Sequence, residues 1–448
     1  MSRFTSILGA DRRRMLDTIG IGSVDELVSA VPAEKRLGRR LDLPSPASEL
    51  ELTREASALA ERNRAAGLVC FAGAGAYDHF IPSVIDHILL RSEFYTAYTP
   101  YQAEVSQGTL QCIFEYQTMM ARLTGLDCAN ASMYDGASAA AEAALMAMRA
   151  TKRDRVAVPA SLNPRYLAVI ETYLAQGGFG IVRIPLLPDG RLDMAAAAGL
   201  LEGCAALMVQ QPDFHGIVQD LKAASDAAHA AGALLVAVTD PVAAAVLESP
   251  GAAGADIAVG EGQSMGVQLS FGGPYVGFMA CRKDLVRNMP GRIIGRTVDK
   301  AGQTGYVLTL QTREQHIRRE KATSNICSNQ ALMALANTVY LSLAGESGFR
   351  ETSLQCHSKA VYLEGRLAGI EGVRRVFTAP FYREFVLEYP VDADELVRKA
   401  ADKGYLAGVP VPSLGRGALL TAVTEKRTRA EMDGLAGVLT AICGGGAA

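Results

Sequence analysis

The sequence has no tryptophan, no marked excess of either charge, no paired-cysteine motif and no long apolar run. Its 448 residues carry 44 Lys and Arg against 47 Asp and Glu, a net charge of −3, which gives no reason to expect nucleic acid or an anionic membrane surface as a partner. No uncharged run approaches the roughly 20 apolar residues of a membrane-spanning helix. The richest stretch, 233–247, is interrupted by Asp240, and Met1–Arg14 has polar and charged residues where a secretory signal peptide has an apolar core.

The eight cysteines are dispersed and form neither a CxxC pair nor a zinc-binding pattern. This distribution is typical of reduced thiols, so we expect a cytoplasmic protein whose cysteines are mostly small core residues. His79 and His87 lie eight residues apart, each beside an aspartate, but this pair is a weak candidate for a metal site. We predict that the chain binds no metal.

The first 65 residues are predicted to form a helical, charged N-terminal arm. Ser23-Val24-Asp25-Glu26 predicts a capping box, with Ser23 as N-cap and Glu26 as its partner three residues later. A proline-containing loop before Ser48 predicts the start of a second helix. Such an arm usually packs on a neighbouring domain or subunit.

Between about residues 110 and 285, helical segments alternate with short β-branched runs. Strands that are apolar on both faces and alternate with helices favour a mostly parallel sheet covered on both sides. The predicted strands are 156–158, 181–184, 206–209, 234–238, 256–259 and 275–280. The predicted helices are 110–123, 139–148, one that starts at Asn163-Pro164, and 221–230.

Beyond about residue 330 the pattern changes to a smaller α/β lobe. It is predicted to contain a helix over 330–343, strands over 373–377, 384–387 and 419–423, and a helix over 429–442. We therefore expect three parts: the arm (1–65), a large domain (66–330) and a small C-terminal domain (331–448).

A glycine-rich stretch precedes the last predicted strand of the large domain. It reads Gly260-Glu261-Gly262-Gln263-Ser264-Met265-Gly266, followed by Phe271-Gly272-Gly273-Pro274-Tyr275. An α/β chain with this turn resembles the aminotransferase-like, fold type I domains of pyridoxal-phosphate (PLP) enzymes, which hold their cofactor as a Schiff base on a lysine amine. Gln263 has no nucleophilic amine, so the resemblance implies that this chain cannot do that chemistry alone and depends on a partner.

Two other places admit both a cofactor role and an ordinary structural role. Asp135-Gly136-Ala137-Ser138 opens a helix, where backbone N–H groups and the helix dipole favour an anion such as the cofactor phosphate. The alternative is a plain N-cap, because the charge of Asp135 would repel a phosphate. Asp240 ends a predicted strand, where related enzymes hold the protonated pyridine nitrogen, or it caps the turn before Pro241.

Three tyrosines and a proline stand close together ahead of a helix. Tyr95, Tyr98 and Tyr101, with Gln102, could line a narrow channel whose hydroxyl groups orient a small polar substrate. The alternative is a loop that packs on the core, which composition alone favours.

A dense run of basic residues, 313–321, precedes Ser324 and Asn325. The basic groups could bind a carboxylate or an acidic surface, and Ser324 and Asn325 could face a substrate. The interleaved glutamates equally predict a solvated, ion-paired helix.

Several long motifs together resemble the glycine decarboxylase P-protein family, and within it the N-terminal-half subunit (subunit 1) of the two-subunit form. The motifs are 71–79 (FAGAGAYDH), 98–102 (YTPYQ), 130–135 (NASMYD), 272–274 (GGP) and 313–321 (REQHIRREK). The resemblance covers nearly the whole chain, including the arm.

This resemblance implies a role in the glycine cleavage system. The P-protein decarboxylates glycine with PLP and transfers the aminomethyl group to the lipoyl arm of the H-protein. In the two-subunit form a homologous subunit 2 carries the cofactor lysine, which matches Gln263 here, and a heterotetramer is the family expectation. PLP is therefore expected on the partner subunit, no catalytic residue is expected in this chain alone, and Ser138 and Asp240 are vestigial.

The resemblance also implies which residues meet the partner. We expect Tyr95, Tyr98, Tyr101, Gln102, Ser324 and Asn325 to reach the partner's active site. Two alternatives stay open: a structural pseudo-enzyme that only stabilises its homologue, and a self-sufficient PLP enzyme that uses another lysine such as Lys321.

Overall fold

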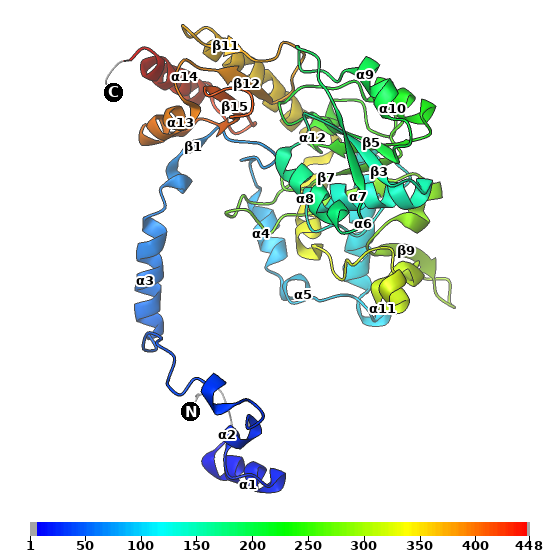
Figure 1. The fold of residues 1–448 in the computed structure, drawn as a ribbon, viewed down its shortest axis with the longest axis vertical. Coiled ribbons are helices and arrows are strands. Elements are labelled where there is room, and N and C mark those ends of the chain that lie inside the picture. Colours follow the sequence, from blue (N-terminus) through cyan, green and yellow to red (C-terminus); the bar gives the residue numbers. More distant parts are fainter. Residues whose placement is uncertain (1–6, 446–448) are drawn as a thin grey trace. The chain divides into compact units, whose positions relative to one another are not determined.

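The computed structural model describes residues 7–445 and divides into two compact units, Met1–Ala66 and Gly67–Ala448 (Figure 1). The predicted domain boundaries at residues 65 and 330 stay predictions. The first six residues of Met1–Arg14, on which the signal-peptide prediction partly rests, lie outside the described range. No helix within residues 7–445 is both long and apolar enough to cross a membrane.

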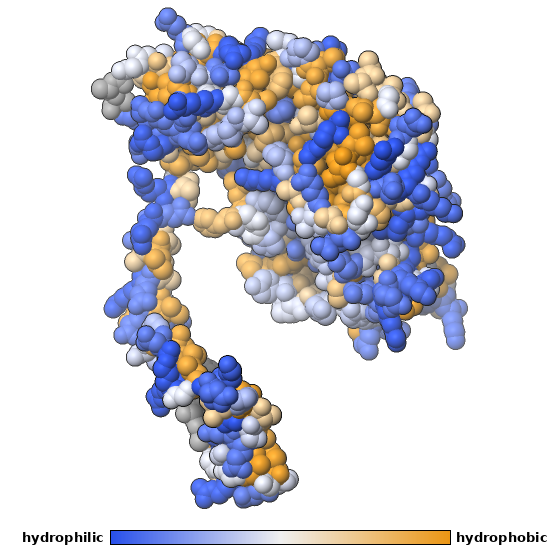
Figure 2. Space-filling model, viewed as in Figure 1, coloured by the Kyte–Doolittle hydropathy of each residue, from blue (hydrophilic) through white to orange (hydrophobic). Residues whose placement is uncertain are grey.

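Between residues 7 and 66 the N-terminal unit contains three α-helices: α1 (Gly9–Ile19), α2 (Val24–Leu27) and α3 (Glu49–Glu61). Helix α3 begins, as predicted, at Ser48, which forms a closed capping box with Glu51. The capping box predicted at Ser23 is wrong: the Ser23 side chain accepts no backbone N–H, and Glu26 accepts the N–H of Gly22 instead (3.0 Å). None of these helices contains a buried residue, and Figure 2 shows apolar side chains on the surface of this unit.

A seven-stranded sheet forms the centre of the second unit, with strand order β2-β8-β7-β6-β5-β3-β4. Strands β3 to β7 run parallel, β8 pairs antiparallel with β7 at one edge, and β2 pairs antiparallel with β8. The mostly parallel sheet predicted from the sequence is therefore confirmed. The strands are β2 (Cys128–Ala129), β3 (Arg155–Pro159), β4 (Gly180–Ile184), β5 (Ala206–Gln211), β6 (Leu234–Thr239), β7 (Ile257–Glu261) and β8 (Gly277–Cys281).

Helices cover both faces of this sheet (Figure 1). They are α6 (Gln107–Thr124), α7 (Gly136–Thr151), α8 (Pro164–Ala175), α9 (Met194–Leu200) and α10 (Leu221–Ala230). The predicted helices are present, and α10 has the predicted bounds. Successive residues of a strand alternate between the faces: Val236 packs in the cluster with α7, whereas Leu235 and Ala237 pack in the cluster with α9 and α10.

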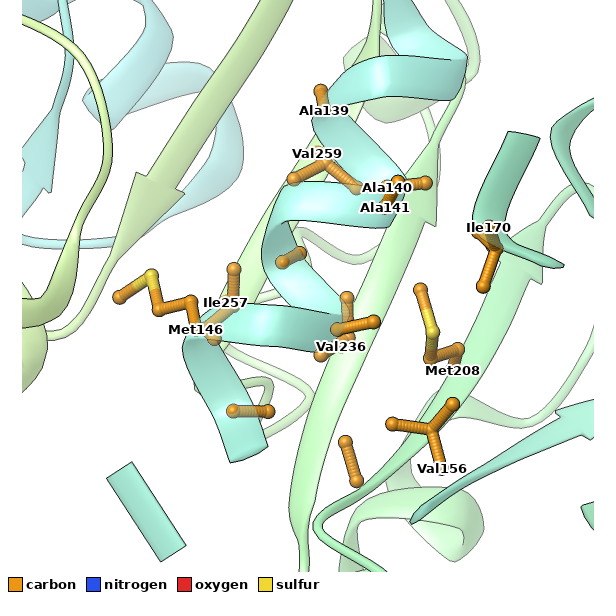
Figure 3. Close-up of a cluster of buried hydrophobic side chains, with 14 of the residues drawn as sticks. Ala139, Ala140, Ala141, Met146, Val156, Ile170, Met208, Val236, Ile257 and Val259 are labelled. Carbon is orange, nitrogen blue, oxygen red and sulfur yellow. The ribbon is translucent and has the colours of Figure 1, made fainter. Parts of the chain in front are cut away.

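The alanine-rich helix α7 lies close against the sheet. Ala139, Ala140 and Ala141 share a fully buried cluster with Val236 and Val259 (Figure 3). Small side chains allow this close approach, because each methyl group leaves room for a branched side chain on the facing strand.

The C-terminal lobe is built on a four-stranded antiparallel sheet, β11-β12-β15-β14. Its strands are β11 (Arg374–Arg375), β12 (Glu384–Glu388), β14 (Val409–Pro410) and β15 (Ala418–Ala422), with helices α13 (Ala393–Asp402) and α14 (Arg429–Cys443). A short strand from the start of the second unit, β1 (Val69–Cys70), pairs with β13 (Tyr405–Leu406) of this lobe. The segment that follows β1 therefore begins beside the C-terminal lobe.

Helix α12 (Ala331–Ala368) is much longer than the predicted 330–343. Gly345, at φ 60° and ψ −175°, interrupts it, so two helices follow each other with one non-helical residue between them. The prediction ended near this break because Gly345 and Gly348 look like helix terminators. The first half packs on α4 (Ser83–Leu89) and α6, and the second half on α14 and β12.

The close approach of α7 predicts a strong response to added volume. Ala141→Leu should lower the free energy of unfolding by about 1–3 kcal/mol, because the larger side chain must displace the facing strand. Ala230→Leu, at an exposed position of α10, is the matched control and should stay within about 0.5 kcal/mol. Urea denaturation measures both, and equal effects of the two substitutions would contradict the packing described here.

Candidate active site

A cavity lies where the carboxyl ends of β6 and β7 face the C-terminal lobe, the usual ligand position in parallel α/β sheets. Asp240 follows β6, and Glu261 ends β7. Tyr77 enters from the loop after β1, and Arg383 and Glu384 enter from the start of β12. The space between these groups is about 40 Å³, which is room for two or three water molecules.

Gln263, the position expected for a cofactor lysine, is buried and bonded to the backbone. Its Oε1 accepts the N–H of Tyr77 (2.8 Å), and its Nε2 donates to Tyr77 O (3.0 Å) and Val267 O (2.8 Å). Both ends of the Gln263 amide are used, the oxygen as an acceptor and the nitrogen as a donor. The side chain therefore holds the Tyr77 loop in place and offers no nucleophile.

The N-terminus of α7 is already occupied by a carboxylate. Glu261 Oε2 accepts the N–H of Gly136 (2.9 Å), and its Oε1 accepts the N–H groups of Gln263 and Val276 (both 3.1 Å). Asp135 and Ser138 close a capping box on the same turn. A carboxylate thus lies where a phosphate would need these N–H groups, and the N-cap interpretation of 135–138 describes the structure.

Asp240 caps the turn before Pro241, which is one of its two predicted alternatives, and it also pairs with an arginine. Its Oδ1 accepts the N–H of Val242 (2.9 Å), which caps the turn, and its Oδ2 forms an ion pair with Arg383 Nη2. The guanidinium carbon of Arg383 lies 3.5 Å from the centre of the Tyr77 ring. A planar cation stacked on an aromatic ring therefore already neutralises the aspartate that would hold a protonated pyridine nitrogen.

Pyridoxal phosphate does not fit this set of residues. The lysine position holds an amide, the helix N-terminus holds Glu261, and Asp240 is paired with Arg383. Among the described residues that line the cavity there is no lysine, and Lys321 is exposed on the turn Arg319–Lys321.

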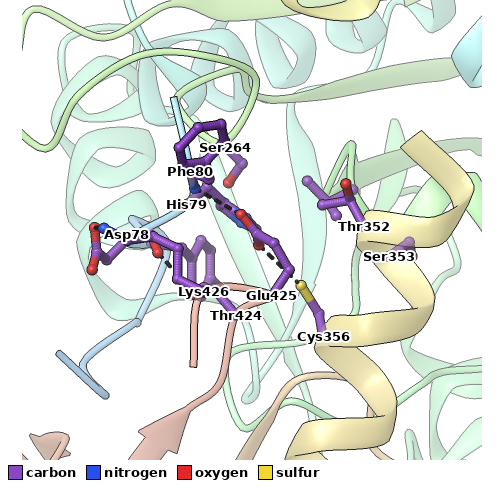
Figure 4. Close-up of polar contacts among 12 residues, drawn as sticks. Asp78, His79, Phe80, Ser264, Thr352, Ser353, Cys356, Thr424, Glu425 and Lys426 are labelled. Carbon is purple, nitrogen blue, oxygen red and sulfur yellow. Dashed lines mark hydrogen bonds and ion pairs between the residues drawn. The ribbon is translucent and has the colours of Figure 1, made fainter. Parts of the chain in front are cut away.

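A second polar cluster adjoins this cavity and contains a thiol. His79 Nδ1 lies 2.6 Å from Glu425 Oε2, and Cys356 Sγ lies 3.6 Å from the same oxygen (Figure 4). Two ligand atoms about 2.0–2.1 Å from a tetrahedral zinc ion would be about 3.3 Å apart, so the 2.6 Å separation is that of a hydrogen bond. His79 Nε2 accepts from Arg383 Nη1 (2.6 Å), which places the ring proton on Nδ1. His87 is exposed on α4.

Burial keeps the Cys356 thiol in its protonated form. It raises the pKa of Cys356 to about 12, so the sulfur acts as a weak hydrogen-bond donor to Glu425. The cluster therefore extends the hydrogen-bonded network that starts at Asp240 and Arg383.

The tyrosine loop, residues 92–102, presents its rings to solvent, so the interpretation of a loop packed on the core is wrong. Tyr95, Tyr98 and Tyr101 are 61%, 78% and 58% exposed, and Gln102 is exposed as well. Tyr95 and Tyr98 line a shallow hollow of about 70 Å³ against α6 and the start of α12.

The loop after the basic run, residues 322–327, contains two predicted site residues, of which one is exposed and the other is hydrogen-bonded inside the chain. Asn325 is exposed, whereas Ser324 donates its hydroxyl to the buried Glu142 Oε1 (2.6 Å). Burial raises the pKa of Glu142. Ser324 thus fixes the loop, and Asn325 is the residue that faces outward.

The basic run is largely exposed, as predicted, but only Gln315–Arg318 of the predicted helix is α-helical. Arg313 is buried and donates to backbone carbonyls, among them Gly291 O (3.0 Å) and Leu310 O (3.1 Å). The remaining basic residues of the run are exposed.

Sequence reasoning missed Glu261 and Arg383. Glu261 stands two residues before Gln263, and its place at the end of a β-branched run was a signal that could have found it. Arg383 reaches Asp240 across 143 residues of sequence, so no local pattern could reveal it.

The comparisons with known proteins agree with this geometry. A model of the "Glycine cleavage system P-protein" family matches residues 2–439. The "Probable glycine dehydrogenase (decarboxylating) subunit 1" of Moorella thermoacetica is 51% identical over 97% of this chain and 98% of its own length. A crystal structure of glycine decarboxylase (P-protein) of the glycine cleavage system, in inhibitor-bound form, superposes with a TM-score of 0.90 and 42% identity, covering 98% of this chain and 100% of that one. The sphingosine-1-phosphate lyase of Burkholderia pseudomallei shares the fold alone, with a TM-score of 0.64 and 14% identity over 90% and 92% of the two chains.

The fold defines a fold type I, pyridoxal-phosphate-enzyme architecture. Within that class the chain belongs to the glycine cleavage system P-protein family.

The buried carboxyl group of Glu384 predicts a pH-dependent stability. Burial raises its pKa from 4.5 to about 7, so the folded state binds the proton more tightly than the unfolded state does. Its contribution to stability is complete below pH 4.5 and is lost as the pH rises to about 7. Glu384→Gln should therefore leave stability nearly unchanged at pH 5 and raise it by about 1–3 kcal/mol at pH 8.

Denaturation of both variants across this pH range measures the effect. Glu388→Gln is the matched control on the same strand, because Glu388 is ion-paired with the exposed Arg374 and should shift stability by less than about 1 kcal/mol. An unchanged difference between Glu384→Gln and wild type from pH 5 to pH 8 would contradict the assignment.

Proposed function

We propose that this chain is the non-lysine subunit of glycine decarboxylase, the P-protein of the glycine cleavage system. The single observation that carries the proposal is Gln263, whose amide is bonded to the Tyr77 backbone at the place of the cofactor lysine. A homologous second subunit supplies the lysine and holds PLP. The assembled enzyme decarboxylates glycine and transfers the aminomethyl group to the lipoyl arm of the H-protein.

The two subunits divide the work. The cofactor on the partner supplies the electron sink for decarboxylation. This chain shapes the entrance to the partner's site, and the exposed rings of Tyr95, Tyr98 and Tyr101 support that role, together with Gln102 and Asn325. Ser324 holds the loop that carries Asn325. Two copies of each subunit in a heterotetramer are the proposed assembly.

A structural pseudo-enzyme that touches no substrate is the second candidate. Its support is the internally satisfied cavity, in which each carboxylate already has partners. The exposed tyrosine loop favours the first candidate, because tyrosine rings combine a flat apolar face with a hydroxyl group suited to a small polar substrate.

Spectroscopy of the separate and assembled subunits tests the proposal. The isolated chain mixed with PLP should show no visible absorbance of a Schiff base, and borohydride should leave no pyridoxyl group on it. Co-expression with a lysine-bearing homologue should restore both signals and glycine–bicarbonate exchange. Decarboxylation of glycine by the isolated chain would overturn the proposal.

Substitutions in the tyrosine loop separate the two candidates. Tyr98→Phe and Tyr101→Phe each remove one hydroxyl group and should lower the turnover of the assembled complex by roughly 5- to 30-fold, the equivalent of one or two hydrogen bonds. Tyr173→Phe, on α8, is the matched control and should have no effect. Turnover at wild-type level in both loop variants would favour the purely structural role.

A further inference from the structure

Among the described residues, Arg292 is the buried arginine with two guanidinium nitrogens that lack a hydrogen-bond partner, whereas Arg383 and Arg427 each lack a partner at Nε alone. Arg383 is paired with Asp240, and Arg427 with Asp78 (3.1 Å), whereas Arg313 uses Nε, Nη1 and Nη2 on backbone carbonyls. Arg292 is equally buried, with 7% of its side chain exposed. Its Nε and Nη1 have no hydrogen-bond partner within the described residues.

The closest ion pair available to Arg292 is incomplete. Glu314 Oε2 lies 3.9 Å from Nε, which is beyond hydrogen-bonding distance. Glu314 is also shared with His316, whose Nδ1 lies 3.9 Å from the same oxygen. The charge of Arg292 is therefore only partly compensated inside this chain.

Arg292 lies at the junction of the two segments proposed to meet the partner's active site. Its Nη2 donates to Cys327 O (2.5 Å) and to the Tyr101 hydroxyl (3.4 Å), and its guanidinium carbon lies 5.5 Å from the centre of the Tyr101 ring. Arg292 thus connects the tyrosine loop with the loop of Asn325. Tyr101 is mostly exposed, so its ring contacts both this guanidinium and solvent.

A buried guanidinium without a full set of partners is costly, and a carboxylate is the group that best compensates it. We propose that Arg292 binds a carboxylate supplied from outside this chain when the Tyr101 ring moves aside. The inference rests on the proposed function, because that function brings the two loops to a shared site. The carboxylate comes from the substrate glycine or from an acidic side chain of the second subunit.

Stability of the isolated chain provides the first test, without any activity. Arg292→Met replaces an incompletely paired charge by an apolar side chain of similar length, so the melting temperature should stay the same or rise. Arg313→Met removes an arginine whose donors are all used, and it should lower the melting temperature clearly. An equal loss in both variants would show that Arg292 is an ordinary structural residue and would overturn the proposal.

Kinetics and affinity of the assembled complex identify the source of the carboxylate. For glycine, Arg292→Met should raise the KM by roughly 10- to 100-fold, the loss of one charge-assisted interaction, with a smaller change in kcat because a guanidinium stabilises the carboxylate more than uncharged CO2. If the carboxylate belongs to a side chain of the second subunit, Arg292→Met should instead raise the dissociation constant of the two subunits by roughly 10- to 100-fold and leave the KM for glycine unchanged. Arg292→Lys, which keeps the charge, should restore part of either loss.

Both constants within twofold of wild type would overturn the carboxylate site. Failure of the proposed function looks different, because the wild-type complex would then show no glycine–bicarbonate exchange. The melting temperatures and the subunit affinity would still decide for or against the carboxylate at Arg292.

Discussion

The hydrogen bonds between the Gln263 amide and the backbone of Tyr77 are the constraint on which the rest of the cavity depends. They hold the loop after β1 across the carboxyl ends of the central strands. That position puts the Tyr77 ring under Arg383 and brings His79 within reach of Glu425. A lysine at position 263 could donate to Tyr77 O but could not accept the Tyr77 N–H, so the loop would lose one of its two anchors.

The charges of the cavity are balanced from within. Glu261 satisfies the N–H groups at the start of α7, and Arg383 neutralises Asp240. Each of these carboxylates therefore has its partners inside the chain. The chain keeps the architecture of its family.

Most of the fold could be predicted from the sequence because its signals are local. Most strands of the parallel sheet are short apolar runs rich in valine and isoleucine, and α10 begins after Asp220 and ends before Gly232, both ordinary helix boundaries. The capping box at Ser23 failed because Glu26 is drawn to the Gly22 N–H, a competition that the motif does not encode. The position of Gln263 was predictable from its motif, whereas the pairing of Asp240 with Arg383 and of Ser324 with Glu142 depends on contacts between distant segments.

The exposure of Tyr95, Tyr98 and Tyr101 could not be predicted from the sequence either. Composition favoured a loop packed on the core, since aromatic rings are usually buried. The rings are exposed, whereas the neighbouring core positions hold Leu110, Ile113 and other apolar residues of α6. Burial depends on what else competes for the interior, and no single segment contains that information.

The Asp240–Arg383 pair joins the central sheet to the C-terminal lobe. Separating these two parts would strand two opposite charges in a poorly solvated place, so the lobe has little freedom to swing. A protein whose central sheet and C-terminal lobe are held together in this way is pre-organised for binding another protein. Its association then costs less conformational entropy than the association of a protein with a hinge between these parts.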